Sequence, residues 1–280
     1  MDPLISTEQL AAALDTDGRR PVVLDVRWRR DGPSGAESYA GAHLPGAVYL
    51  DLDRDLAAEP GTGGRHPLPE PGALRASLRR AGVRRDRPVV VYDDADGSVA
   101  ARAWWLLRWA GHTEVAVLDG GFAAWTAENR PVTDTVPEPE PGDVDVCPGG
   151  MPVVDADGAA ALAREGVLLD ARAGERYRGE TEPLDSRAGH IPGARSAPFA
   201  AHTGPDGRWL PPAELAAILA DAGVAPGVPV GAYCGSGVTA ASVVLAVEVA
   251  GRETAALYPG SWSQWSADPQ RPVATGELPG

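Results

Sequence analysis

The sequence contains no lysine, only two cysteines and no long apolar run. All 25 of its cations are therefore arginines, which face 39 acidic residues and leave a net charge of −14. Two cysteines exclude a disulfide framework and a four-cysteine zinc site, and they favour a reducing compartment. No apolar stretch approaches the roughly 18 residues that a membrane span requires. The acidic balance disfavours nucleic acid and anionic membrane surfaces as partners.

The N-terminal residues lack the basic region and apolar stretch of an export signal, so we expect a cytoplasmic protein. The five histidines and two cysteines show no HxxxH or CxxC spacing, so we expect neither a metal nor a cofactor. A chain of 280 residues is long enough for one large domain or for two smaller ones, each with its own core.

An internal duplication decides between these two possibilities. Short motifs of the first half return in the second half, in the same order and at a nearly constant offset. The pairs are Val-Val-Leu-Asp at 22–25 with Val-Leu-Leu-Asp at 167–170, His-Leu-Pro-Gly-Ala at 43–47 with His-Ile-Pro-Gly-Ala at 190–194, and Ala-Gly-Val at 81–83 with Ala-Gly-Val at 222–224. The chain is therefore predicted to be a tandem repeat of one fold.

Each half alternates short apolar runs with helical patterns, which is typical of βα units and of a parallel sheet covered on both faces. Residues 133–150 between the halves are rich in proline and acidic residues and show no periodicity, as in an extended linker. We therefore predict an α/β protein with a first domain at 1–132, a linker at 133–150 and a second domain at 151–280.

Cys234 follows a predicted buried strand and precedes an apolar, helix-like run at 240–250. Ligand sites of open α/β sheets gather at such carboxyl ends of strands. The glycines of the intervening loop let backbone N–H groups point inward as an anion nest, and two hydroxyls add further donors. We expect this loop to favour an anion on the Cys234 sulfur. Its residues are Gly235, Ser236, Gly237, Val238 and Thr239.

Three other interpretations compete with a reactive cysteine. A lone cysteine after a strand is more often a small buried apolar residue, but such a residue needs no glycine loop beside it. A phosphatase would need an arginine six residues after the cysteine, where this chain has Ala240. A non-catalytic module that binds an anion or a partner protein stays open. Cys147 lies in the linker, without a charged partner or a helix start.

The tandem organisation, the paired His-Leu-Pro-Gly and His-Ile-Pro-Gly segments and the Cys-Gly-Ser-Gly-Val-Thr loop resemble the two-domain rhodaneses. These are the thiosulfate and 3-mercaptopyruvate sulfurtransferases, and the resemblance runs from about residue 4 to 270. It implies two rhodanese-like domains, of which the first is catalytically silent because Asp93 stands in the place of Cys234. It also implies a Cys234 persulfide, a small anionic sulfur donor, and an acceptor such as cyanide, a thiol or a thioredoxin-like protein.

The neutral loop resembles that of mercaptopyruvate-using members, because thiosulfate-using members place arginine and lysine after the cysteine. We therefore expect 3-mercaptopyruvate as the donor and keep a thiosulfate-specific enzyme as the alternative. In mercaptopyruvate-using relatives a serine, a histidine and an aspartate form a proton relay. The matching residues here are Ser236, His66 and Asp53.

Arg176 matches a substrate-binding arginine of the family. The position of a second such arginine is occupied by Asp185, so Arg187 is the candidate to replace it. His43 and His190 recur in both halves, including the half without the cysteine, so we expect structural hydrogen bonds from them rather than chemistry.

Overall fold

The computed structural model describes residues 1–16 and 18–280. The chain divides into two compact units. Most of the first half of the chain forms unit 1, and most of the second half forms unit 2. Two short segments are exceptions, because each lies in one half of the sequence but belongs to the unit that the other half forms. Unit 1 comprises Met1–Ala58, Pro69–Gly150 and Thr203–Trp209, and unit 2 comprises Glu59–Leu68, Met151–His202 and Leu210–Gly280.

Unit 1 is built on a five-stranded parallel sheet of order β1-β5-β4-β2-β3. Its strands are β1 (Leu4–Ile5), β2 (Val22–Asp25), β3 (Val48–Tyr49), β4 (Val89–Tyr92) and β5 (Val115–Leu118). Its helices are α1 (Thr7–Asp15), α2 (Gly35–Gly41), α3 (Leu52–Asp55), α4 (Pro71–Arg80), α5 (Ser98–Trp109) and α6 (Gly121–Ala127). The central strands β4 and β5 are buried throughout, which explains their continuous apolar sequences.

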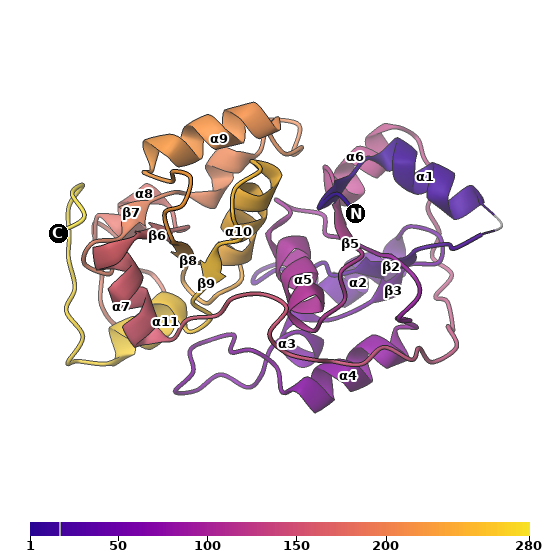
Figure 1. Ribbon diagram of the computed structural model, residues 1–280. Coiled ribbons are helices and arrows are strands. Elements are labelled where there is room, and N and C mark those ends of the chain that lie inside the picture. Colours follow the sequence, from indigo (N-terminus) through magenta and orange to yellow (C-terminus); the bar gives the residue numbers. More distant parts are fainter. Residues whose placement is uncertain (17) are drawn as a thin grey trace. The chain divides into compact units, whose positions relative to one another are not determined.

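Unit 2 repeats this plan with a four-stranded parallel sheet of order β7-β6-β8-β9. Its strands are β6 (Val167–Asp170), β7 (Arg195–Ser196), β8 (Val230–Tyr233) and β9 (Ala256–Leu257). Its helices are α7 (Ala156–Glu165), α8 (Gly174–Tyr177), the 3-10 helix η1 (Phe199–His202), α9 (Pro212–Asp221), α10 (Ala240–Val249) and α11 (Ser261–Ala267). In Figure 1, α9 and α10 lie on one side of this sheet, and α7 and α11 lie on the other.

The two sheets have equivalent orders, since β9-β8-β6-β7 matches β5-β4-β2-β3 strand by strand. Even the register agrees: Asp25 pairs with Tyr92 in unit 1, and Asp170 pairs with Tyr233 in unit 2. The predicted α/β architecture with two parallel sheets flanked by helices is confirmed. The place of β1 is taken in unit 2 by a single parallel bridge, between Val153 and Leu257.

Residues 133–150, predicted as a linker, belong to unit 1 and are hydrogen-bonded to it. The amide of Gly142 donates to the carbonyl of Arg79 at 2.7 Å, and the amide of Cys147 donates to that of Ala110 at 2.9 Å. A Cβ on Gly142 would lie 1.8 Å from the carbonyl oxygen of Val83, so only glycine fits there. Across residues 1–16 and 18–280, no helix has both the length and the apolar character to cross a membrane.

Candidate active site

Cys234 lies directly after β8, and the loop that follows it leads into α10. The residue is only 1% exposed. Its backbone N–H donates to Oγ of Ser261 at 3.1 Å, and its Sγ accepts the backbone N–H of Gly237, also at 3.1 Å. Gly237 has φ +83°, and a Cβ on it would lie 2.4 Å from the carbonyl oxygen of Pro259. Glycine is therefore required for the loop to turn its amide toward the sulfur.

The equivalent loop of unit 1 shows what this backbone does with an anion. Asp93 follows β4 as Cys234 follows β8, and its carboxylate accepts hydrogen bonds from the backbone N–H groups of Ala95, Gly97, Val99 and Ala100 at 3.0–3.1 Å. Burial raises the pKa of Asp93 to about 6, although these hydrogen bonds act in the opposite direction. The loop of this repeat is thus an anion nest, and in unit 1 the chain's own carboxylate fills it.

His66 contacts Ser236, the second residue after Cys234. Both residues belong to unit 2, and Nδ1 of His66 lies 2.8 Å from Oγ of Ser236. The segment Glu59–Leu68 that carries His66 is held by two further hydrogen bonds of unit 2. The amide of Arg65 donates to Oγ of Ser263 at 3.0 Å, and Nε2 of Gln264 donates to the carbonyl of Thr62 at 3.0 Å.

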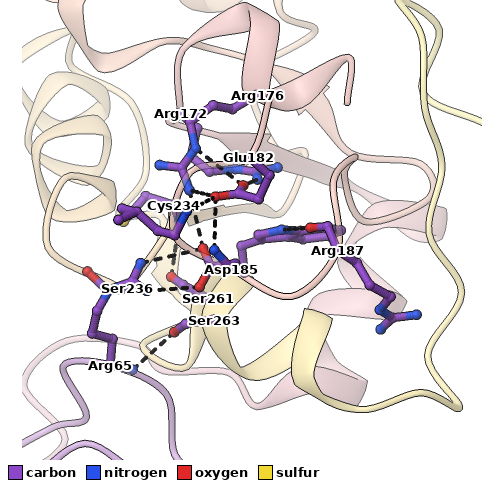
Figure 2. A network of polar contacts seen from close by, with 12 residues as sticks. Arg65, Arg172, Arg176, Glu182, Asp185, Arg187, Cys234, Ser236, Ser261 and Ser263 are labelled. Carbon is purple, nitrogen blue, oxygen red and sulfur yellow. Dashed lines mark hydrogen bonds and ion pairs between the residues drawn. The ribbon is translucent and has the colours of Figure 1, made fainter. Parts of the chain in front are cut away.

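A network of arginines and carboxylates lies next to Cys234 (Figure 2). Arg176, on α8, donates to Glu182 through Nε at 3.3 Å and through Nη2 at 2.6 Å, and Nη2 also reaches Asp185 at 3.2 Å. Arg65 donates to the same Asp185 through Nη1 at 2.9 Å and Nη2 at 3.4 Å. Asp185 therefore links two guanidinium groups.

The network extends inward to a buried ion pair. Arg172 donates to Asp170 through Nη2 at 2.6 Å, to the carbonyl of Gly189 at 2.6 Å, and to Glu182 at 3.3 Å. Burial lowers the pKa of Arg172, but the charge of Asp170 outweighs it and the pKa is raised overall. Burial raises the pKa of Glu182, but hydrogen bonds from Arg176 and from backbone amides outweigh it and the pKa is lowered. Both groups therefore stay charged.

Comparison with known families identifies the fold. Residues 6–128 and 155–268 each match the family described as rhodanese-like domain. The chain belongs to the two-domain rhodaneses. The family expected from the sequence is thereby confirmed.

Similar proteins agree with this assignment. The rhodanese is 47% identical to the probable 3-mercaptopyruvate sulfurtransferase of Pseudomonas aeruginosa, over 98% of each chain. It is 45% identical to SseB of Mycobacterium tuberculosis, a putative thiosulfate sulfurtransferase, over 98% of this chain and 97% of the other. The crystal structure of SseA from Escherichia coli, a 3-mercaptopyruvate sulfotransferase, matches with a TM-score of 0.84 at 30% identity, covering 94% of this chain and 100% of that one.

These relatives establish the rhodanese as an enzyme, a sulfurtransferase. It therefore takes sulfur from a donor and passes it to an acceptor. The names of these relatives differ in the sulfur donor, 3-mercaptopyruvate or thiosulfate, so they do not identify the donor of this enzyme.

Arg187, the candidate for the second substrate-binding arginine, has a different set of partners. Its guanidinium donates to four backbone carbonyls, at distances of 2.6–3.0 Å. These belong to Trp265, Ser266, Asp268 and Arg271. Figure 2 shows the side chain extending away from Cys234. The reason is local: the last turn of α11 and the residues after it present several backbone carbonyls, and an arginine fork can donate to several of them at once.

The other residues predicted for the site lie on α3 and in the loop after Cys234. Asp53 lies on α3 in unit 1, where it accepts a hydrogen bond from Nε1 of Trp28 at 2.8 Å, and its part in a relay stays a prediction. Gly235 is buried beside Cys234, and its carbonyl accepts the amide of Ser263 at 2.9 Å. Val238 is buried in the same loop, and Thr239 is the N-cap residue of α10, without a capping hydrogen bond from its side chain.

His43 and His190 have equivalent surroundings in the two units. Nδ1 of each ring lies 2.8 Å from a backbone carbonyl, that of Tyr39 or Tyr177. Each ring also stacks on the side chain of that same tyrosine, with centroids 3.9 and 3.8 Å apart. These contacts are the structural hydrogen bonds expected from the repetition.

Arg65 and the pair formed by Asp170 and Arg172 were not anticipated from the sequence. The pair leaves a signal, because Leu-Asp-Val-Arg at 24–27 returns as Leu-Asp-Ala-Arg at 169–172. Arg27 and Asp25 make the same buried ion pair in unit 1, at 2.7 Å. Arg65 leaves no comparable signal, because its partner Asp185 is 120 residues away.

Proposed function

We propose that this rhodanese takes sulfur from 3-mercaptopyruvate as a persulfide on Cys234 and passes it to a thiophilic acceptor. The observation that carries the proposal is the hydrogen bond between His66 and Ser236. Ser236 is the second residue after Cys234 in the sequence. A histidine that is hydrogen-bonded to a hydroxyl is a pair that can transfer a proton, and only one of the two candidate donors needs such a pair.

The first half-reaction joins the Cys234 sulfur to the sulfur of the donor. The Cys234 thiolate attacks the thiol sulfur of 3-mercaptopyruvate, a sulfur–sulfur bond forms, and the carbon–sulfur bond breaks. The electron pair of the broken bond goes to the pyruvate fragment, which leaves as an enolate. The enolate carbon takes up a proton while the persulfide gives up the proton that the donor thiol carried, so pyruvate and a Cys234 persulfide anion remain. We expect His66 and Ser236, which are hydrogen-bonded to each other, to move this proton.

The loop after Cys234 is suited to the negative charge that the Cys234 sulfur carries before this step and that the persulfide carries after it. The amide of Gly237 already donates to Sγ, and the matching loop of unit 1 holds a carboxylate with four amides. Such a loop stabilises the thiolate before the reaction and the persulfide anion after it. In the second half-reaction an acceptor such as cyanide, a small thiol or a thioredoxin-like protein attacks the outer sulfur, and the Cys234 thiolate returns as leaving group.

Thiosulfate is the second candidate donor, and the guanidinium groups of Arg65 and Arg176 favour it, because both lie next to Gly235. The transfer from thiosulfate releases sulfite, and no carbon takes up a proton. The pair of His66 and Ser236 would then have no proton to move. The loop itself carries no cation, and both arginines are already paired with carboxylates, so the dianion gains less there.

Steady-state kinetics with the two donors tests the proposal. We expect kcat/KM to be higher with 3-mercaptopyruvate than with thiosulfate, and the mass of Cys234 to rise by one sulfur atom when donor is added without acceptor. Cys234→Ser should abolish transfer with both donors, and Cys147→Ser, at the exposed cysteine, should not. A higher kcat/KM with thiosulfate would reject 3-mercaptopyruvate as the donor. A Cys234 that takes up no sulfur from either donor would instead indicate a non-catalytic module that binds an anion or a partner protein.

A further inference from the structure

Unit 1 contains a cavity of about 650 Å³ at the edge of its sheet where the strands begin. Pro21 and Val23 of its lining lie at the start of β2, and Arg87 lies shortly before β4. The loop with Asp93 follows β4, at the opposite end of that strand. The cavity is therefore separate from the anion loop of unit 1, and its size is that of a small-molecule site.

The lining of this cavity combines an apolar wall with guanidinium groups. The apolar part comes mainly from α1, α6 and β2, and α1 and α6 lie next to each other in Figure 1. The charged part comes from Arg20, Arg87 and Arg130, against one carboxylate, that of Asp15. Three positive charges and one negative charge leave the lining at +2, in a chain whose net charge is −14. The cavity is thus a locally positive site in an acidic protein.

The guanidinium groups keep hydrogen-bond donors for a ligand. Among the described residues, the side chain of Arg87 makes no hydrogen bond or ion pair. Nε of Arg20 donates to the carbonyl of Thr16 at 2.9 Å, and its Nη atoms donate to no described residue. Arg130 is partly occupied, because its Nε donates to Glu128 at 2.8 Å. Most of the N–H donors of Arg20 and Arg87 therefore remain available to an anion.

The second repeat shows what covers the same place in unit 2. Gly46, which lines the cavity, corresponds to Gly193 in the second Pro-Gly turn. The amide of Gly193 donates to the carbonyl of Pro279 at 2.6 Å, and a Cβ on Gly193 would lie 2.6 Å from the carbonyl oxygen of Ala163. Among the described residues, the amide of Gly46 donates to no acceptor, and a Cβ on it would have nothing within 4 Å. The chain itself fills this place in unit 2 and leaves it open in unit 1.

We propose that the cavity of unit 1 binds a small organic anion, a carboxylate or a phosphate ester on an apolar body. The wall formed by α1, α6 and β2 receives the apolar body. Arg20 and Arg87 bind the charged oxygens, and the amide of Gly46 is a further donor. In unit 2 the equivalent amide already binds an oxygen, that of Pro279. The site gives the unit without the reactive cysteine a ligand of its own, whichever sulfur donor the enzyme uses.

A peptide segment is the alternative occupant, because the segment with Pro279 covers the equivalent place in unit 2. A peptide carries an N–H group for nearly every carbonyl. Apart from Asp15, however, the side chains of the lining are either apolar or hydrogen-bond donors. The three arginines also favour more negative charge than a peptide backbone provides. A ligand that accepts hydrogen bonds without donating them therefore fits this lining better.

Fluorescence titration with two matched probes tests the site. Anilinonaphthalene sulfonate (ANS) has an apolar body and one negative charge, and phenylnaphthylamine (NPN) has the same body without the charge. We expect the parent protein to bind ANS. Arg87→Gln should raise the Kd for ANS about tenfold, the loss of one charge-assisted hydrogen bond, and change the Kd for NPN by less than about twofold. A parent that binds no ANS, or a variant with the parent's Kd for ANS, would overturn the proposal.

Arg30→Gln is the matched control for Arg87→Gln. Arg30 is an exposed arginine of unit 1 that follows β2, at the opposite end of that strand from the cavity, and it pairs with Asp31. Its loss removes the same charge from the same unit, so both Kd values should stay unchanged. Arg87 is exposed as well, so both variants should keep the parent's melting temperature. Equal weakening of ANS in the two variants would show an effect of net charge alone and reject the site.

Competition then identifies the class of ligand. Phenylacetate and phenyl phosphate carry a carboxylate and a phosphate on the same apolar ring, and inorganic phosphate has no apolar body. We expect at least one phenyl compound to displace the ANS whose binding depends on Arg87, at concentrations about tenfold or more below those that inorganic phosphate requires. The stronger of the two identifies the charged group.

Two results of this competition would overturn the proposal. Inorganic phosphate that displaces ANS as well as the phenyl compounds do would mean that the apolar wall takes no part in binding. Displacement by the blocked peptide acetyl-Leu-Pro-Gly-amide, whose sequence is that of residues 278–280, but by neither phenyl compound would assign the cavity to a peptide.

Discussion

His66 and Ser236 are 170 residues apart in sequence, yet Nδ1 of the first lies 2.8 Å from Oγ of the second. Two different elements make this contact possible. Ser236 is held in the glycine loop after β8, and His66 is brought to unit 2 by the segment Glu59–Leu68. The pair is therefore positioned by the tertiary fold and not by either local sequence.

Ser236→Ala should affect the two donors differently. The pyruvate enolate needs a proton and sulfite does not, so the variant should lower kcat with 3-mercaptopyruvate by about a hundredfold or more, the usual contribution of general acid–base catalysis. Turnover of thiosulfate should stay within about twofold, because no proton is moved to carbon. Parallel steady-state assays with both donors measure the difference.

Ser242→Ala is the matched control for this prediction. Ser242 lies on α10 and its hydroxyl donates to the carbonyl of Thr239 at 2.7 Å, so the variant also removes a buried hydroxyl near the loop. It should leave the ratio of the two donors unchanged. Equal losses with both donors in Ser236→Ala would argue for a general effect on the loop and against a proton relay.

Gly235→Ala should block the space between the guanidinium groups of Arg65 and Arg176. Gly235 has no positive φ, so alanine is compatible with the backbone, but its methyl carbon would lie 3.2–3.6 Å from three guanidinium nitrogens. We expect KM for the donor to rise about tenfold or more, since the methyl group displaces the ligand from its hydrogen bonds. The melting temperature should change little.

Gly72→Ala provides the comparison. A Cβ at Gly72, on α4, has nothing within 4 Å, so the same substitution should leave KM unchanged and stabilise the protein slightly. A Gly235→Ala variant that keeps the parent KM would place the donor elsewhere.

The duplication and the glycine loop after Cys234 could be recognised from the sequence because both depend on local patterns. Short apolar runs, helix-like stretches and the Cys-Gly-Ser-Gly loop are each contained in a few neighbouring residues. The match between Asp93 and Cys234 follows from aligning the two halves. The sheet orders then agree with the prediction because the repeat copies topology along with sequence.

The network of arginines and carboxylates next to Cys234 could not be predicted in the same way. Asp185 was recognised as the loss of an arginine, but its effect on Arg65 depends on a contact across 120 residues. Arg187 was chosen because it is close in sequence to Asp185, whereas its direction is set by the backbone carbonyls in the last turn of α11 and after it. Which way a long side chain turns is decided by tertiary partners that a sequence pattern does not contain.

Asp93→Asn should destabilise unit 1. The amide of asparagine replaces one acceptor oxygen by an NH₂ group, which would face two backbone N–H donors that now bind Asp93. Two buried donors left without an acceptor cost about 2–4 kcal/mol in the free energy of unfolding. Urea unfolding measures the loss.

The control substitution for Asp93 lies in the same loop. Asp96 accepts one hydrogen bond, from the amide of Ser98 at 3.0 Å, so Asp96→Asn should cost no more than about 1 kcal/mol. Similar losses in the two variants would mean that the four amides around Asp93 do not act as a nest.

His202 should make the protein sensitive to acid. Its side chain on η1 is fully buried, neither ring nitrogen has a hydrogen-bond partner among the described residues, and burial lowers the pKa of His202 to about 4. Because the folded-state pKa lies below the unfolded value of about 6.5, the folded state prefers the neutral ring. Its contribution to stability is complete above pH 6.5 or so and is lost as the pH falls through about 4, by up to about 3 kcal/mol.

His202→Phe keeps a ring of similar size and removes the titration. Urea unfolding of the parent and the variant at about pH 7.5 and pH 5 should show a smaller loss of stability in the variant at the lower pH. His112, whose pKa burial also lowers, is present in both proteins, so its contribution cancels in the comparison. An equal loss of stability in both proteins would mean that the ring of His202 gains a partner or solvent when it is protonated, and that its burial imposes no penalty on the charge.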